Sequence, residues 1–207
     1  MGAIKKIFLF ALCMFYFMGC GKTSEEEIMF RENTVVHIQC ETLQGSGVIY
    51  NADQDQVIVA TAAHVVKDAQ EVWIGSQKVN HIYLVEGLDL VFLVLEDVNI
   101  MEGVKLPHSY TDQAADRQDL ILRGYDSIGN YVEISGKFKE NWIYVEDFQC
   151  HMMIAEAQAT PGMSGGGVFD QNGVFQGIIC GIDQEGNVAI LPASVIASEY
   201  AVLFEDL

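Results

Sequence analysis

Short apolar runs, separated by residues that favour turns, recur along this chain and constrain its fold more than any other feature. Runs of this length are typical of buried strands rather than of helices. The first group lies at residues 34–40, 47–50, 57–60, 71–74, 81–85 and 90–95. After a less apolar connection the second group lies at residues 120–124, 131–135, 142–145, 152–156, 167–169, 174–181 and 188–191. The pattern predicts an all-β chain with two β-barrels, and residues 192–203 predict a helix after them.

The amino terminus has the pattern of an export signal. Lys5 and Lys6 precede an apolar run from Ile7 to Met18, which is shorter than the about 20 residues that a spanning helix needs. The run ends at Phe17-Met18-Gly19-Cys20, which resembles a bacterial lipobox except that Phe17 stands where Leu is usual. We expect a signal peptide at 1–19, lipid attachment at Cys20, and a tether at 20–27. The protein would then lie on the extracytoplasmic face of a bacterial envelope; simple secretion or an uncleaved anchor is the alternative.

Net charge and cysteine content exclude several classes of function. The formal net charge of −18 argues against contact of the folded domain with nucleic acid or anionic lipid, so the lipid at the amino terminus would be its membrane contact. Beyond Cys13 and Cys20, the remaining cysteines (Cys40, Cys150 and Cys180) allow at most one disulfide, and buried free thiols are the simpler expectation. No spacing of Cys and His predicts a metal site, and we expect no metal or cofactor.

Three residues in separate motifs could together supply nucleophilic catalysis. Ser164 lies in the Gly-rich segment 161–167, His64 ends Thr61-Ala62-Ala63-His64, and Asp89 lies in Gly87-Leu88-Asp89-Leu90. A serine hydroxyl needs a base to take its proton, and the base needs a carboxylate to fix its tautomer. Taken singly, Ser164 could belong to an ordinary turn and Asp89 could face water at a strand edge. Their joint occurrence favours a catalytic set.

Other residues compete for these roles less well. Weaker candidates for the acid are Glu86, Glu96 and Asp97. Histidines without a comparable context are interpreted as structural, namely His37, His81, His108 and His151.

Gly162-Met163-Ser164-Gly165-Gly166 also matches G-x-S-x-G, the nucleophile elbow of α/β-hydrolases. That fold runs from Ser through the acid to His along the chain. Here no histidine follows Ser164, and the glycines after it oppose the helix that the elbow requires. The elbow interpretation is therefore excluded.

The order His64, Asp89, Ser164 and the flanking residues resemble the chymotrypsin-like (trypsin-fold) serine peptidases, in particular their bacterial HtrA-like and glutamyl-endopeptidase-like branch. Residues 45–66 resemble the strand and histidine loop of that branch. The resemblance implies two six-stranded antiparallel β-barrels with a C-terminal helix. The first barrel would occupy residues 28–112, and the second barrel with its helix 113–207. It also implies an oxyanion hole formed by the backbone N–H groups of Gly162 and Ser164.

Two positions depart from the relatives. Trypsins carry an aspartate immediately before the serine, which pairs with a newly cut amino terminus, whereas this chain has Met163. The specificity histidine of glutamyl endopeptidases would fall near Ile179, which offers no charge. By resemblance, Gln158 would lie at the base of the pocket for the P1 residue, the residue preceding the scissile bond, with Ile179, Cys180 and Gly181 as the facing wall.

Together these features predict a serine endopeptidase that acts on proteins or peptides through His64, Asp89 and Ser164. The alternative is an inactive trypsin-fold lipoprotein that binds peptides or proteins.

Overall fold

The computed structural model describes residues 34–52, 56–98 and 118–204. The predicted signal peptide, Cys20 and the tether at 20–27 lie outside the described residues. So do both ends of the predicted first barrel at 28 and 112, and His108.

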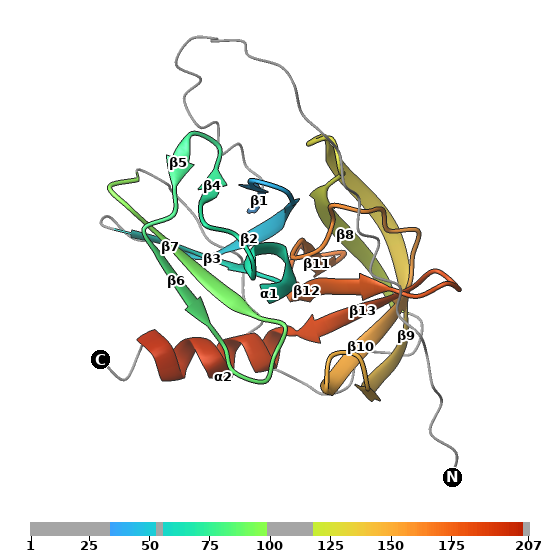
Figure 1. Ribbon diagram of the computed structural model, residues 1–207. Coiled ribbons are helices and arrows are strands. Elements are labelled where there is room, and N and C mark those ends of the chain that lie inside the picture. Colours follow the sequence, from blue (N-terminus) through green and yellow to red (C-terminus); the bar gives the residue numbers. More distant parts are fainter. Residues whose placement is uncertain (1–33, 53–55, 99–117, 205–207) are drawn as a thin grey trace.

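The first unit is an antiparallel sheet of seven strands in the order β5-β4-β1-β2-β3-β7-β6 (Figure 1). Its strands are β1 (Val35–Cys40), β2 (Gln44–Ala52), β3 (Gln56–Thr61), β4 (Val72–Ile74), β5 (Gln77–Lys78), β6 (His81–Leu84) and β7 (Val91–Glu96). All six predicted runs form strands, but the unit is an open sheet rather than a closed six-stranded barrel. The seventh strand, β5, has two exposed residues and forms one edge, and β6, exposed along its length, forms the other.

The second unit is a closed barrel of six strands in the order β10-β13-β12-β11-β8-β9. Its strands are β8 (Asp119–Tyr125), β9 (Tyr131–Val145), β10 (Cys150–Glu156), β11 (Gly167–Asp170), β12 (Phe175–Ile182) and β13 (Asn187–Pro192), and helix α2 (Ala193–Phe204) follows directly. The predicted fold class is confirmed: the chain is mostly β, with one closed barrel, a second curved sheet and a C-terminal helix.

Two predicted strands, at 131–135 and 142–145, are one continuous strand in the structure. β9 pairs with β8 through its first half and with β10 through its second half. The intervening residues are mostly polar, and buried Gly136 and Phe138 alternate with exposed Lys137 and Lys139. A glycine carries no apolar side chain, so the alternation of buried and exposed positions here is not visible as an alternation of apolar and polar residues in the sequence.

The central strands of the first unit are apolar without interruption because both of their faces are covered. On β7, Phe92 and Val94 belong to a core shared with the second barrel, whereas Leu93 and Leu95 belong to a core within the first unit. Strands buried on both faces have no reason to alternate with polar residues. The shared core holds the two units against each other.

Helix α2 strengthens that junction. It follows β13 of the second barrel, yet its rings pack on the first unit, with the Tyr200 ring 4.9 Å from that of Tyr50 and the Phe204 ring 5.6 Å from that of Phe92. Full burial of a Phe side chain contributes about 1.5–3 kcal/mol, and the partly buried rings of α2 contribute a fraction of that. In Figure 1 the helix runs beneath the first unit, which fixes the relative position of the two units. Within the described ranges, no helix is long and apolar enough to span a membrane.

Candidate active site

His64 lies on a single helical turn, α1 (Ala63–Val66), which follows β3 directly. Val65 and Val66 of this turn are buried in the core of the first unit and anchor it. The imidazole is 25% exposed, so the ring is accessible from solvent while its backbone is fixed. The local sequence thus places a partly exposed base on a rigid support.

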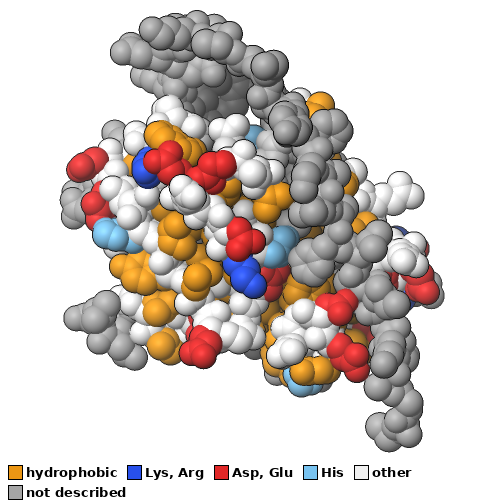
Figure 2. Space-filling model, viewed as in Figure 1, with side chains coloured by type: hydrophobic (Ala, Val, Ile, Leu, Met, Phe, Trp, Pro, Cys, Tyr) orange, Lys and Arg blue, Asp and Glu red, His pale blue; other side chains and the backbone are white. Residues whose placement is uncertain are grey.

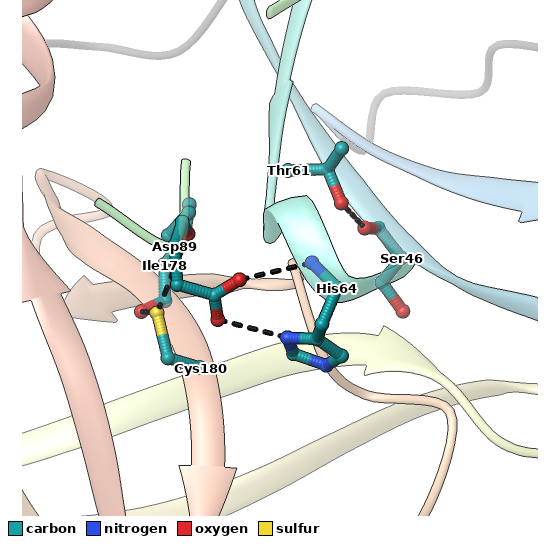
Figure 3. Close-up of polar contacts among 6 residues, drawn as sticks. All are labelled: Ser46, Thr61, His64, Asp89, Ile178 and Cys180. Atoms are coloured by element: carbon teal, nitrogen blue, oxygen red, sulfur yellow. Dashed lines mark hydrogen bonds and ion pairs between the residues drawn. The ribbon is translucent and has the colours of Figure 1, made fainter. Parts of the chain in front are cut away.

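Asp89 lies in the segment between β6 and β7 and binds His64 twice. Its Oδ2 is 2.8 Å from His64 Nδ1, and its Oδ1 accepts a hydrogen bond of 2.9 Å from the backbone N–H of His64 (Figure 3). The carboxylate is only 11% exposed. An ionised carboxylate can only accept, so Nδ1 carries the proton of a neutral ring and Nε2, which faces away from Asp89, is the basic nitrogen. The structure therefore joins two of the three predicted catalytic residues.

The weaker acid candidates lie elsewhere. Glu96 pairs with His81 at 3.2 Å on the surface of the first unit, and Glu86 and Asp97 are exposed. None of the contacts found for these acids in the described part of the chain involves His64.

Cys180 packs against Asp89 from the second barrel. Its Sγ lies 3.9 Å from the backbone carbonyl oxygen of Asp89 and 4.0 Å from that of Ile178 (Figure 3). Burial, and to a smaller extent the charge of Asp89, raises the pKa of the Cys180 thiol well above its usual value. Burial likewise raises the pKa of Cys40 and Cys150 to about 11. All three cysteines are free and protonated at neutral pH, so none is an activated nucleophile.

Ser164 comes from the second barrel, in a segment that we call the nucleophile loop (residues 160–166). The loop crosses to the first unit, where the carbonyl oxygen of Ser164 accepts a hydrogen bond of 2.8 Å from the backbone N–H of Ser46. A Cβ added to Gly45 would lie 3.2 Å from that same oxygen and 2.6 Å from a methyl group of Val65. Ser164 is therefore beside the turn that carries His64.

The loop that carries the predicted oxyanion-hole residues, Gly162 and Ser164, has a backbone conformation that depends on two glycines. Gly162 has φ +97°, and a Cβ there would lie 2.5 Å from the backbone carbon of Asp126. Gly165 has φ +81°, and a Cβ there would lie 2.1 Å from both the Ser46 carbonyl oxygen and Thr61 Oγ1. A side chain at either position would displace the loop.

The predicted pocket residues are differently placed. Gln158 is exposed and Gly181 is partly exposed, whereas the side chains of Ile179 and Cys180 are almost fully buried. Ile179 also uses its backbone within the protein, donating to Gly166 O and accepting from Gly165 N. Ile179 and Cys180 therefore offer the predicted pocket no exposed side-chain surface.

Ser46 and Thr61 were not singled out by the sequence, although both are fully buried polar residues at this site. Thr61 Oγ1 donates a hydrogen bond of 2.6 Å to the Ser46 carbonyl oxygen (Figure 3). The signal that could have found Ser46 is its position between Gly45 and Gly47 in β2. In the described residues, no three His, Cys, Asp or Glu side chains are grouped as metal ligands would be.

His37 lies where the first unit meets the turn between β8 and β9. Its ring stacks on Tyr125 at 5.1 Å, its Nε2 is 2.9 Å from Gln44 Oε1, and Gln44 in turn donates to the carbonyl oxygen of Ser127. Burial lowers the pKa of His37 below its ordinary value of 6.5, against the raising effects of Gln44 and Asp126. The folded state therefore favours the neutral form of the His37 ring.

We expect this histidine to make stability depend on pH. Because its pKa is lower in the folded state, the unfolded chain binds more protons as pH falls below about 6.5, so the free energy of unfolding should fall from there to the folded-state pKa. Thermal unfolding from pH 7.5 to 5 should show a weaker pH dependence in His37→Gln than in wild type. Exposed His81→Gln is the control, and an identical slope in wild type and His37→Gln would contradict this role.

Comparison with known proteins agrees with this geometry. A family model described as a trypsin-like peptidase domain matches residues 45–178, a range that contains His64, Asp89 and Ser164. No curated protein sequence matches the chain.

Crystal structures of the Rv3671c protease from M. tuberculosis resemble the chain in fold. An inactive form is 22% identical with a TM-score of 0.68, covering 84% of this chain and 90% of that one. An active form is 21% identical with a TM-score of 0.65, covering 82% and 80%. An inactive-form mutant is 20% identical with a TM-score of 0.67, covering 82% and 85%. With the family model spanning more than half of its residues, the chain belongs to the trypsin-like peptidase family.

Proposed function

We propose that this protein is a serine endopeptidase that cleaves peptide bonds through Ser164, His64 and Asp89. The observation that carries the proposal is the doubly bonded His64–Asp89 pair, beside which the nucleophile loop brings Ser164. Membership of the trypsin-like peptidases supports the same chemistry.

The proposal gives each residue a chemical role. His64 Nε2 takes the proton of the Ser164 hydroxyl as Oγ attacks the peptide carbonyl, and later gives that proton to the leaving amine. Asp89 holds the proton on Nδ1 and stabilises the imidazolium that forms. The N–H groups of Gly162 and Ser164 bind the oxygen that becomes negative. Water then hydrolyses the acyl-enzyme by the same steps.

An active-site probe tests the proposal directly. A fluorophosphonate phosphonylates a serine only when a base activates it, so wild type should be labelled at Ser164 and Ser164→Ala should not. Ser135→Ala, which removes an exposed serine of β9, is the control and should be labelled like wild type. Failure of wild-type protein to react would favour the alternative, an inactive lipoprotein that binds peptides or proteins.

The proposal includes a cellular location. Cys20 would be the first residue of the mature protein and would carry lipid on the outer face of a bacterial membrane, as its position after Gly19 and a short apolar run suggests. One acyl chain binds a membrane only weakly, so stable anchoring needs more than one. Cys20→Ser should abolish lipid attachment and leave the precursor unprocessed, which the mass of the purified protein would show. Processing and membrane binding of this variant that both equal those of wild type would contradict lipidation.

The many acidic side chains of the domain fit such a tethered position. Figure 2 shows them scattered over the visible face, with few Lys or Arg among them. A surface of this kind repels anionic lipid headgroups, so the folded domain would stand away from the bilayer.

We further propose that the P1 residue is uncharged and small or medium in size, such as Ala, Val, Leu or Met. Gln158 is neutral, and the acid that follows the pocket wall, Asp183, is buried with its Oδ1 accepting from the backbone N–H groups of Glu185 and Asn187. An Arg or Lys side chain would therefore lose its hydration without gaining a partner. Residues 180–182 of β12 follow the last pair with β11, Gly167 with Ile178, and so could bind an extended substrate by strand addition.

A peptide-library cleavage profile tests this specificity. Wild type should prefer uncharged P1 residues, and Gln158→Asp should shift the profile toward Arg and Lys because it supplies the missing carboxylate. Gln70→Asp, which adds the same charge to the first unit, should leave the profile unchanged. Dominant Arg, Lys or Glu at P1 in wild type would refute the pocket assignment without affecting the catalytic roles.

A further inference from the structure

Ser46 stands out among the buried polar residues because all of its hydrogen-bonding groups are engaged at the active site. It is fully buried on β2, and its backbone N–H donates to the carbonyl oxygen of Ser164 at 2.8 Å. Its hydroxyl donates to the carbonyl oxygen of Gly162 at 2.8 Å and accepts from the backbone N–H of Tyr125 at 2.7 Å. Its own carbonyl oxygen accepts from Thr61 Oγ1.

These bonds reach the two residues whose N–H groups would form the oxyanion hole. The hydrogen bond to the carbonyl oxygen of Gly162 fixes the peptide plane between Gly162 and Met163. The hydrogen bond to the carbonyl oxygen of Ser164 fixes the peptide plane that follows Ser164. Between them, Met163 N–H donates to Thr160 O at 3.1 Å. Ser46 thus holds the loop on both sides of the residue that precedes the nucleophile.

The loop needs such support because its glycines do not fix their own conformation. Gly162 and Gly165 both have positive φ, which glycine adopts about as readily as negative φ, so contacts with the surroundings must select it. Trypsins order this loop with an aspartate next to the serine, but here that position is Met163, whose side chain is fully buried in the core of the second barrel and carries no charge. Neither an ion pair nor a charge is available at Met163 to orient the loop.

The packing around Ser46 leaves it little freedom. A Cβ added to Gly124 of β8 would lie 3.0 Å from Ser46 Oγ and 3.1 Å from Met163 Cα. Ser46, a residue of the first unit, therefore sits between β8 and the nucleophile loop, both of which belong to the second barrel.

From these contacts we propose that Ser46 is a positioning residue, which holds the nucleophile loop so that the N–H groups of Gly162 and Ser164 converge on the substrate oxygen. The inference rests on the proposed serine peptidase function. In this proposal the hydroxyl of Ser46, a residue of the first unit, orders an oxyanion hole that is formed by residues of the second barrel.

The test compares substrate turnover with binding of a transition-state mimic. A peptide aldehyde adds to the nucleophilic serine and places an oxyanion in the hole, so its inhibition constant reports on the hole itself. Ser46→Ala should lower kcat roughly 10- to 100-fold, below the about 10²–10³ for loss of a hole donor, and weaken aldehyde binding by a similar factor. KM for the matching peptide amide should change little. The P1 residue of both ligands is taken from the wild-type library profile.

A matched control separates positioning from general destabilisation. Val57→Ala opens a cavity in the first unit at the end of β3 far from Thr61, and it should reduce the melting temperature without altering kcat or aldehyde binding. Unchanged kcat and aldehyde binding in folded Ser46→Ala would overturn the inference while leaving the triad intact. A wild type that neither hydrolyses peptide nor reacts with fluorophosphonate would overturn both proposals.

If Ser46→Ala does not fold, Ser46→Cys replaces it. A thiol is a weak hydrogen-bond donor, so a several-fold parallel loss in kcat and aldehyde affinity is expected. Wild-type values of both quantities in folded Ser46→Cys would overturn the inference.

Discussion

Replacement of Ser164 by Ala is expected to reduce kcat by a factor on the order of 10⁴ to 10⁶, and replacement of His64 by Ala by a similar factor. Without the hydroxyl no acyl-enzyme can form, and without the imidazole nothing takes its proton. The double variant should lose about as much kcat as either single variant, because Ser164 and His64 act as a unit and removal of one leaves the other without function. The measurement is the rate of peptide hydrolysis by each single variant and by the double variant, at saturating substrate.

Controls for this comparison come from the same residue types elsewhere. Ser135→Ala and His81→Ala alter exposed side chains outside the site and should keep wild-type kcat. Activity of wild type should fall in acid, because a protonated imidazole cannot accept the serine proton. Full hydrolysis by either purified Ser164→Ala or His64→Ala would refute the proposed mechanism, whatever the fold.

Much of the strand pattern could be predicted from the sequence because the central strands are continuous apolar runs. The run at 57–60 is extended by one residue at each end in β3 (Gln56–Thr61), and the run at 90–95 is β7 (Val91–Glu96) shifted by one. The unpredicted elements have no such signal: β5 is two exposed residues, and β9 passes through residues 136–141, where the buried alternate positions are Gly136 and Phe138.

The His64–Asp89 contact was predictable because each residue stands in a local motif, and the fold brings the two motifs together. The surroundings of Ser46 were not predictable in the same way. Its partners Thr61, Tyr125, Gly162 and Ser164 are spread over the chain, and a serine between two glycines gives no indication of them. The burial of the Ile179 side chain could not be predicted for a related reason. An apolar residue on a strand can face either the core or a pocket, and only the register of β12 decides which.

Replacement of Asp89 by Asn is expected to lower kcat by about 10⁴ while leaving the fold intact. Asp89 accepts two hydrogen bonds from His64, one from the backbone N–H at 2.9 Å and one from Nδ1–H at 2.8 Å. An asparagine has one accepting oxygen, and the backbone N–H is a fixed donor that must keep it. The amide NH₂ then faces Nδ1, which becomes an acceptor, so the ring proton moves to Nε2. In that tautomer Nε2 cannot take the proton of Ser164.

Steady-state kinetics and thermal unfolding together distinguish this tautomer effect from loss of structure. Asp89→Asn should keep KM and nearly the wild-type melting temperature, because the amide fills the same space, retains the bond from the backbone N–H and donates a bond to Nδ1 in place of the other. Asp97→Asn neutralises an exposed acid directly after β7 and should leave kcat unchanged. If kcat of Asp89→Asn stayed within tenfold of wild type, the carboxylate would not be setting the tautomer of His64. The base would then have to be oriented by another group.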